Sequence, residues 1–206
     1  MFMSHARIML NFKASYLAKS RFDLFTTSFQ VSTQAIRFRL LNSHKNPQIF
    51  SDSSRKSLQP LEMDEKFSSL LKHFKYGVPW SNTLVYSLMA NKIAGAGGSY
   101  KGLENHLDIV NYYKQMDLYF DNVRREGLQI PKAESYLGLL TGRFAMDGVT
   151  IEILDDGEPV FAGRGTHRLA MSCAAERPWT PAFLVGISRN SLITKNWSRH
   201  LRVDRP

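Results

Sequence analysis

Cysteine and long apolar segments are both scarce in this chain of 206 residues, and each scarcity excludes a class of protein. The single cysteine, Cys173, excludes an internal disulfide framework and any zinc site built from several cysteines. No apolar run approaches the length that a membrane-spanning helix needs. We therefore expect a protein of the reducing cytoplasm that has no membrane partner.

Clusters of catalytic or metal-binding side chains are also missing from the sequence. The six histidines are scattered, and no two lie three or four residues apart, the spacing that places two metal ligands on one helix face. No pair of carboxylates and no set of Ser, His and Asp stands at a recognisable spacing. We therefore expect no metal site built from side chains alone.

Acidic residues are rare at both ends of the chain, although the formal net charge is +9. Residues 1–60 carry nine Lys or Arg and two acids, residues 189–206 carry five and one, and residues 61–188 keep a net charge of −2. This distribution predicts a basic N-terminal segment (1–60), a near-neutral domain (61–188) and a basic tail (189–206). The basic ends are either solvated or bind nucleic acid in a salt-dependent way, whereas the near-neutral domain disfavours DNA binding along its body.

The N-terminal segment supports two interpretations. Its wealth of Ser, Thr and Arg is typical of a transit peptide, which would form one amphipathic basic helix. The apolar and β-branched residues of 22–29 and 36–41 instead favour one or two edge strands, followed by a mobile segment at 42–58.

A helical pattern begins at Met63. An apolar stripe at i, i+3, i+4 and i+7 predicts the first helix, which Gly77 ends. Ser81 or Asn82 is expected to cap a second helix with Leu88 turned inward. The stripe consists of Phe67, Leu70, Leu71 and Phe74.

The third and longest helix is predicted at 103–126, with Leu107 on its apolar side and Gly127 at its end. Arg124 and Arg125 lie in its last turn, where cations complement the helix dipole. Before it, the Gly-rich segment 95–102 lacks the Gly-Lys-Ser/Thr ending of a phosphate loop and follows a helix. We interpret this segment as a flexible connector; the alternative is a lid that carries Lys101 to a nucleotide.

The segment from Val149 to Ile187 has the richest pattern. Alternating apolar residues predict a strand, Asp-Gly predicts a tight turn, and glycines then open a loop before another helix. The predicted elements are a strand at 149–154, a turn at 155–158, a strand at 159–162, a loop with Gly163 and Gly165, a helix capped by Thr166 that stops near Pro178, and a strand at 183–187.

A strand, a glycine loop and a helix start together make an anion-binding arrangement. Glycine lets the backbone approach a ligand, and the first N–H groups of a helix carry the positive end of its dipole. Arg164 and Arg168 add planar guanidinium groups that suit phosphate, and His167 can donate to an oxygen or move a proton. The alternative is an ordinary tight turn with a solvated Arg pair. The candidate binding residues are Gly163, Arg164, Gly165, Thr166, His167 and Arg168.

The tetrapeptide Gly165-Thr166-His167-Arg168, placed after a hairpin and at a helix start, resembles the nucleotide-binding loop of the ParB/sulfiredoxin-like superfamily. Two upstream elements strengthen the likeness to a ParB-like branch: Gly-Val-Pro-Trp-Ser-Asn-Thr at 77–83 and Arg-Glu-Gly at 125–127. The resemblance covers roughly residues 63–188. It implies a mixed α/β fold, with a small mixed sheet and helices packed around it.

The resemblance also implies a function, namely binding of ATP or CTP with Mg²⁺ carried by the phosphates. It adds Arg125 as a secondary phosphate ligand, because in this family the segment after that helix comes near the nucleotide. Thr166 stands where sulfiredoxins place their catalytic cysteine, so sulfinic-acid reduction is not implied. The loop around Arg164 is one Gly-rich step longer than the compact family form.

Phosphate hydrolysis or transfer would need a general base, and Glu152 and His167 are the candidates. Glu152 alternates with inward residues on its strand, so it faces either solvent or the cleft. The leading hypothesis is a nucleotide-binding domain with possible phosphate chemistry. The alternatives are a nucleic-acid-binding or nuclease-like module and a non-catalytic interaction module.

Overall fold

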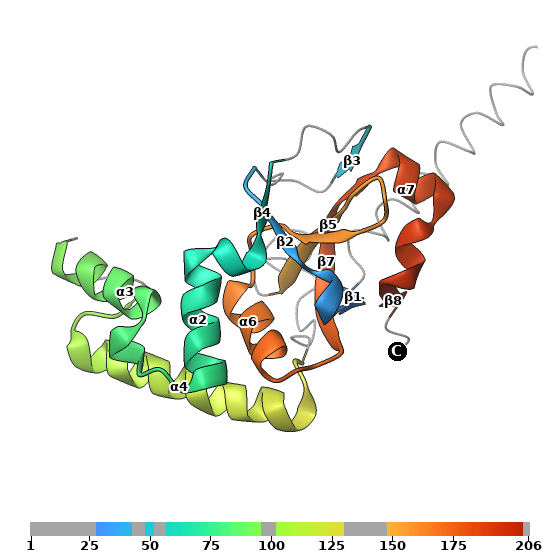
Figure 1. The fold of residues 1–206 in the computed structure, drawn as a ribbon. Coiled ribbons are helices and arrows are strands. Elements are labelled where there is room, and N and C mark those ends of the chain that lie inside the picture. Colours follow the sequence, from blue (N-terminus) through green and yellow to red (C-terminus); the bar gives the residue numbers. More distant parts are fainter. Residues whose placement is uncertain (1–27, 43–47, 52–56, 96–101, 130–147, 204–206) are drawn as a thin grey trace, which may run out of the picture.

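The computed structural model describes residues 28–42, 48–51, 57–95, 102–129 and 148–203. These residues form a mixed α/β fold, which confirms the predicted fold class (Figure 1). Among them, no helix is both long and apolar enough to cross a bilayer.

The sheet has eight strands, in the order β4-β2-β6-β5-β7-β1-β8, with β3 paired to β7 beside this path. β5 runs parallel to β7 and antiparallel to β6, while β6 runs parallel to β2. The strands are β1 (Ser28–Ser32), β2 (Phe38–Leu40), β3 (Gln48–Phe50), β4 (Leu58–Pro60), β5 (Val149–Ile153), β6 (Pro159–Phe161), β7 (Trp179–Ser188) and β8 (Leu201–Val203).

The helices gather mainly on one side of the sheet (Figure 1). α2 and α6 lie next to each other, α4 runs across their lower ends, and α7 stands on the opposite side of the molecule. The helices are α2 (Glu65–Tyr76), α3 (Leu84–Gly95), α4 (His106–Glu126), α6 (Thr166–Ala174) and α7 (Arg189–Thr194). The short 3-10 turns are η1 (Thr33–Ala35), η2 (Leu61–Met63), η3 (Trp80–Asn82) and η5 (Asn196–Arg199).

Two helix predictions hold in part. α2 ends at Gly77 in the left-handed conformation, as predicted, with Phe67, Leu70 and Phe74 buried. The predicted caps of α3 are wrong, because Ser81 and Asn82 belong to η3 and it is Thr83 Oγ1 that accepts from Tyr86 N at 3.3 Å. Leu88 and Leu107, predicted to face inward, are exposed.

The sheet includes strands from both segments that were expected to flank the domain, residues 1–60 and 189–206. β1 lies between β7 and β8, so it is an interior strand rather than an edge strand, and β3 falls within the segment 42–58 that was predicted to be mobile. Residues 189–203 fold into α7, η5 and β8, and Leu201 on β8 is buried. The sheet therefore extends beyond both boundaries expected at 61 and 188. The proposed targeting segment and the Gly-rich segment with Lys101 lie largely outside the described residues.

β5 is buried at all five positions, although its alternating sequence predicted one buried face. Neighbouring strands and packed elements cover both sides, as is usual for a strand in the middle of a sheet that is layered on both faces. Glu152 is consequently fully buried, which excludes the solvent-facing one of the two orientations that its sequence left open.

Candidate functional site

The loop between β6 and α6 is built as predicted, except for its cap. Gly165, with φ of +83°, occupies the N-cap position of α6, and Thr166 is the first helical residue and is buried. The prediction that the Thr166 hydroxyl caps the helix is therefore wrong. Because glycine has no side chain, no N-cap side chain accepts from the N–H groups of the first turn, where the dipole favours an anion.

Gly165 is required by space as well as by its dihedral angle. A Cβ atom added there would lie 2.5 Å from Gly148 O and 2.7 Å from Val149 Cα. Both contacts are with backbone, which cannot move aside as a flexible side chain can. The start of α6 is therefore in close backbone contact with the start of β5. Gly163 also has a positive φ, of +94°.

Thr150 on β5 holds the loop in place. Its N–H donates to Arg164 O at 3.1 Å, and its Oγ1 accepts from Arg164 N at 3.2 Å. Its carbonyl accepts from Ala162 N at 2.8 Å. Sequence reasoning missed this residue, because the partners are separated along the chain and no local pattern marks them.

The three basic side chains of the loop differ in their surroundings. Arg164 is exposed, whereas His167 and Arg168 are partly buried. The Nε atom of Arg168 is buried and has no hydrogen-bond partner in the structure as described. A buried N–H without an acceptor costs about 1–3 kcal/mol, so this position favours an anionic oxygen as partner.

A third arginine, Arg39, which the sequence analysis missed, lies on the strand beside β6. β2 pairs with β6 in parallel, and Arg39 is opposite Phe161, two residues before Gly163. Arg39 forms an ion pair with the buried Asp64, whose Oδ1 also accepts from Phe67 N at 2.7 Å as the cap of α2. Asp64 thus neutralises part of the charge that Arg39 brings to this end of the sheet.

Glu152 lies on the same strand as Thr150, two residues farther along, and its alternation places it on the same face. A Cβ atom at Gly186 would lie 2.8 Å from Glu152 Cγ, so glycine on β7 makes room for this side chain. Being fully buried, Glu152 does not meet solvent water in this conformation. Of the two predicted general bases, His167 is the one in the loop itself.

Arg125 does not join the loop. Arg177, just beyond α6, donates to Val123 O at 2.8 Å, which places the last turn of α4 at the C-terminal end of α6. α6 has nine residues, so Gly165, at its N-terminal end, lies on the order of 13 Å from this contact along the helix axis. The expected phosphate contact of Arg125 in the loop is therefore not supported.

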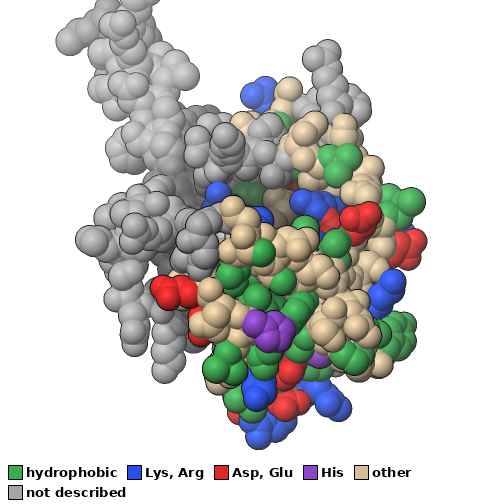
Figure 2. All heavy atoms as spheres, turned by 90° about the vertical axis from the view of Figure 1, so that its left-hand side faces the viewer, with side chains coloured by type: hydrophobic (Ala, Val, Ile, Leu, Met, Phe, Trp, Pro, Cys, Tyr) green, Lys and Arg blue, Asp and Glu red, His purple; other side chains and the backbone are tan. Residues whose placement is uncertain are grey.

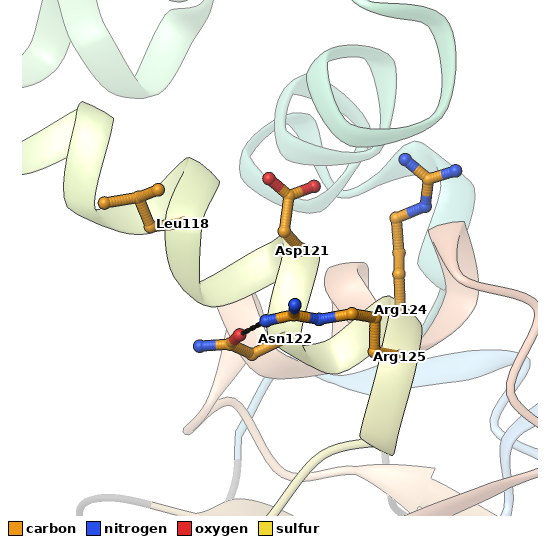
Figure 3. Close-up of a pocket in the computed structure, with 5 residues that line it drawn as sticks. All are labelled: Leu118, Asp121, Asn122, Arg124 and Arg125. Atoms are coloured by element: carbon orange, nitrogen blue, oxygen red, sulfur yellow. Dashed lines mark hydrogen bonds between the residues drawn. The ribbon is translucent and has the colours of Figure 1, made fainter.

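Figure 3 shows Arg125 running back along α4 to Asn122, to which it is hydrogen-bonded. Both residues line a cleft of about 620 Å³ together with Leu118, Asp121 and Arg124. Since all five residues come from one helix, the described chain supplies only one wall of this cleft.

The motif at 77–83 holds three elements together through side-chain contacts. Trp80 Nε1 donates to Asp117 Oδ1 at 2.9 Å, and His73 Nε2 lies 2.8 Å from the same oxygen. The His73 ring stacks on Trp80 with centroids 3.6 Å apart, and its Nδ1 lies 2.6 Å from Val78 O. This motif therefore joins α2, η3 and α4.

Within the described residues, no three or more His, Cys, Asp or Glu side chains are grouped to hold a metal ion. A scan against protein-family models found no match, and searches of curated proteins and of solved structures found none either. The likeness to the ParB/sulfiredoxin-like superfamily thus rests on the three motifs quoted above.

Proposed function

We propose that the loop Gly163–Arg168 binds the phosphate groups of a nucleoside triphosphate. The observation that carries this proposal is the buried Nε–H of Arg168, which has no acceptor among the described residues and belongs to the first turn of α6. Helix N-termini and guanidinium groups both favour phosphate oxygens. The ParB-like motifs support the same ligand class.

The parts of the loop have different roles in this proposal. Thr150 holds the backbone at Arg164, and Gly165 brings the helix start against β5. Arg164 is exposed and free to close over a bound phosphate from the solvent side. Mg²⁺ would be held mainly by the phosphates and water, because no carboxylate cluster stands in the described chain.

The proposed activity is binding, and the nucleotides to compare are ATP and CTP. If phosphate is also hydrolysed, His167 is our proposed general base, because it belongs to the loop itself. Glu152 is less suited to this step, since it is fully buried.

The test is the melting temperature of the full chain with millimolar ATP, CTP or GTP, with and without Mg²⁺. A ligand at a hundred times its Kd stabilises the folded state by about 2.7 kcal/mol, a shift of several degrees. Arg168→Ala should abolish the shift, whereas Arg125→Ala, at the far end of α6, should keep it. An unshifted melting temperature would count against the proposal and favour a non-catalytic interaction module, and an equal shift in Arg168→Ala would count against it by showing that the nucleotide binds elsewhere.

A further inference from the structure

The first two turns of α2 and the segment that follows this helix border a pocket that the nucleotide proposal does not use. The volume of the pocket is about 390 Å³, and its walls come from η2, α2, η3 and the start of α3. These walls belong to the continuous described stretch 57–95. Their enclosed volume lies near the lower end of the range for sites that hold small molecules.

A hydrogen bond fixes the two sides of the pocket to each other. The N–H group of Leu84, the first residue of α3, donates to Ser69 Oγ of α2 at 2.8 Å, and Ser69 is buried. Thr83, also buried, donates through its Oγ1 to Trp80 O at 2.6 Å. The walls are therefore held together in the free protein, so little ordering entropy is lost when a ligand binds.

Charged side chains of opposite sign lie at different ends of the pocket. Glu62 and Glu65 are at the η2 end, and Lys72 follows Glu65 by seven positions, on the order of 10 Å along the axis of α2. All three are exposed, and none forms an ion pair with the described part of the chain. The neighbouring Asp64 is already paired with Arg39. The pocket therefore has a negative end and a positive end.

The pocket also offers apolar surface. Met63, Val78 and Leu84 line it, and Met63 is 63% exposed. Apolar surface that a ligand removes from water favours binding, and the flexible thioether of methionine adapts to side chains of different shapes. A ligand with an apolar group and a charge at each end would therefore match the pocket.

The surrounding surface does not favour a large ligand of one charge. The described residues among 57–129 hold seven Lys or Arg and eight Asp or Glu. On the side of the molecule shown in Figure 2, basic and acidic side chains are interspersed around hydrophobic ones. A nucleic acid would be repelled by Glu62 and Glu65 at the pocket itself. A small ligand that carries both charges suits these surroundings better.

We propose that this pocket binds a short peptide with free termini, about three residues long. The ammonium group of the peptide pairs with Glu62 and Glu65, and its carboxylate pairs with Lys72. Its middle side chain contacts Met63 and Leu84. An extended peptide spans about 3.3–3.6 Å per residue, so three residues match the separation of the charged ends. The proposal is independent of the phosphate loop.

The test is an NMR titration of the ¹⁵N-labelled full chain with the tripeptide Ala-Leu-Ala. Shift changes should concentrate in residues 62–84, with a Kd in the millimolar range or below. The N-acetylated and the C-amidated tripeptides each lack one terminal charge and should bind about two- to fivefold more weakly. The dipeptide Ala-Leu is too short to reach both ends and should also bind more weakly.

The informative variant is Glu62→Gln with Glu65→Gln, which keeps the size of both side chains and removes their charges. It should weaken binding of Ala-Leu-Ala by about as much as acetylation does. The acetylated peptide should bind this variant and the wild type equally, because the ammonium group that pairs with the carboxylates is already missing. The matched control is Glu104→Gln with Glu126→Gln, which removes two exposed charges outside the pocket and should leave the Kd within about twofold.

Three results would overturn the proposal. The first is an absence of shift changes in residues 62–84 at millimolar Ala-Leu-Ala. The second is an equal Kd for the free, acetylated and amidated peptides, which would show that the terminal charges are not recognised. The third is an equal loss of affinity in the two double variants, which would indicate attraction by net charge alone.

Discussion

Gly77 and Gly165 have the same backbone conformation but are constrained by different contacts. Both have a positive φ, of +69° and +83°, and each lies at one end of a helix. Nothing lies within 4 Å of a Cβ atom added at Gly77, whereas at Gly165 such an atom would meet the backbone of Gly148 and Val149. Gly77 is therefore needed for its dihedral angle alone, and Gly165 for its dihedral angle and its size.

The two turns also differ in what holds them. Around Gly77 the contacts come from side chains, since Asp117 binds both Trp80 and His73. Around Gly165 they come mainly from the strand β5, whose Thr150 bonds the Arg164 backbone. A loop fixed by backbone contacts keeps its shape when surface side chains change, which suits the phosphate-binding role proposed for it.

The largest effect is expected for Gly165→Ala. The left-handed conformation costs about 1–2 kcal/mol for a non-glycine residue, and the backbone clash adds about 1–3 kcal/mol. We expect a loss of about 3 kcal/mol or more in the free energy of unfolding, measured by urea denaturation. A loss no greater than that of Gly77→Ala would show that the close backbone contact between Gly165 and the start of β5 does not constrain the fold.

Asp117→Ala tests the side-chain contacts of the other turn. It leaves Trp80 Nε1 without its acceptor and removes the partner of His73 Nε2, so we expect a loss of about 2 kcal/mol. Asp121→Ala, one turn farther along α4, is the control and should change stability by less than about 0.5 kcal/mol. Equal effects of the two substitutions would contradict the structural role of the contacts that Asp117 makes with Trp80 and His73.

Cys173, on α6 near the last turn of α2, provides a pH-dependent test. Burial raises the pKa of its thiol from 9.0 to about 11, while Lys75 acts in the opposite direction. The unfolded thiol ionises first as the pH rises, so this contribution to stability is complete below pH 9 and is lost between pH 9 and 11. We expect the melting temperature to fall by a few degrees more in the wild type than in Cys173→Ala between about pH 8 and about pH 10.5. Parallel pH curves for the two proteins would show that the thiol is as solvated as in the unfolded chain.

The smallest effect is expected for Gly77→Ala. With open space around the Cβ position, only the conformational cost remains, about 1 kcal/mol. Gly77→Asn should recover part of this loss, because asparagine tolerates the left-handed region better than alanine does. Urea denaturation measures both, and a loss above about 2 kcal/mol in Gly77→Ala would reveal a contact that the geometry does not show.

Local patterns predicted the parts of the fold that depend on neighbours in sequence. Gly77 and Gly127 end their helices as expected, because a glycine with a positive φ leaves the helical conformation. The β5–β6 hairpin and the start of α6 were also predicted, from the Asp-Gly turn and the glycine loop. The cap of α6 was assigned one residue too late, since Thr166 has the right chemistry for a cap that Gly165 in fact provides.

Residues brought together from distant parts of the chain could not be predicted in this way. Thr150 bonds the loop, and Arg39 lies opposite Phe161, only because β5 and β2 flank β6 in the sheet. Arg125, close to a matching motif in sequence, lies at the wrong end of α6. Glu152 is buried because of what covers its strand, which its own alternation does not reveal.

Helix ends, the hairpin and the run of charge in residues 189–203 were thus settled by the order of amino acids, since each depends on dihedral preference or composition within a few residues. The hydrogen bonds of Thr150 to the loop, the position of Arg39 beside β6 and the burial of Glu152 were settled by strand pairing. Strand pairing joins segments far apart in the chain, and the free energy that selects one pairing over another comes from the packing of the whole core.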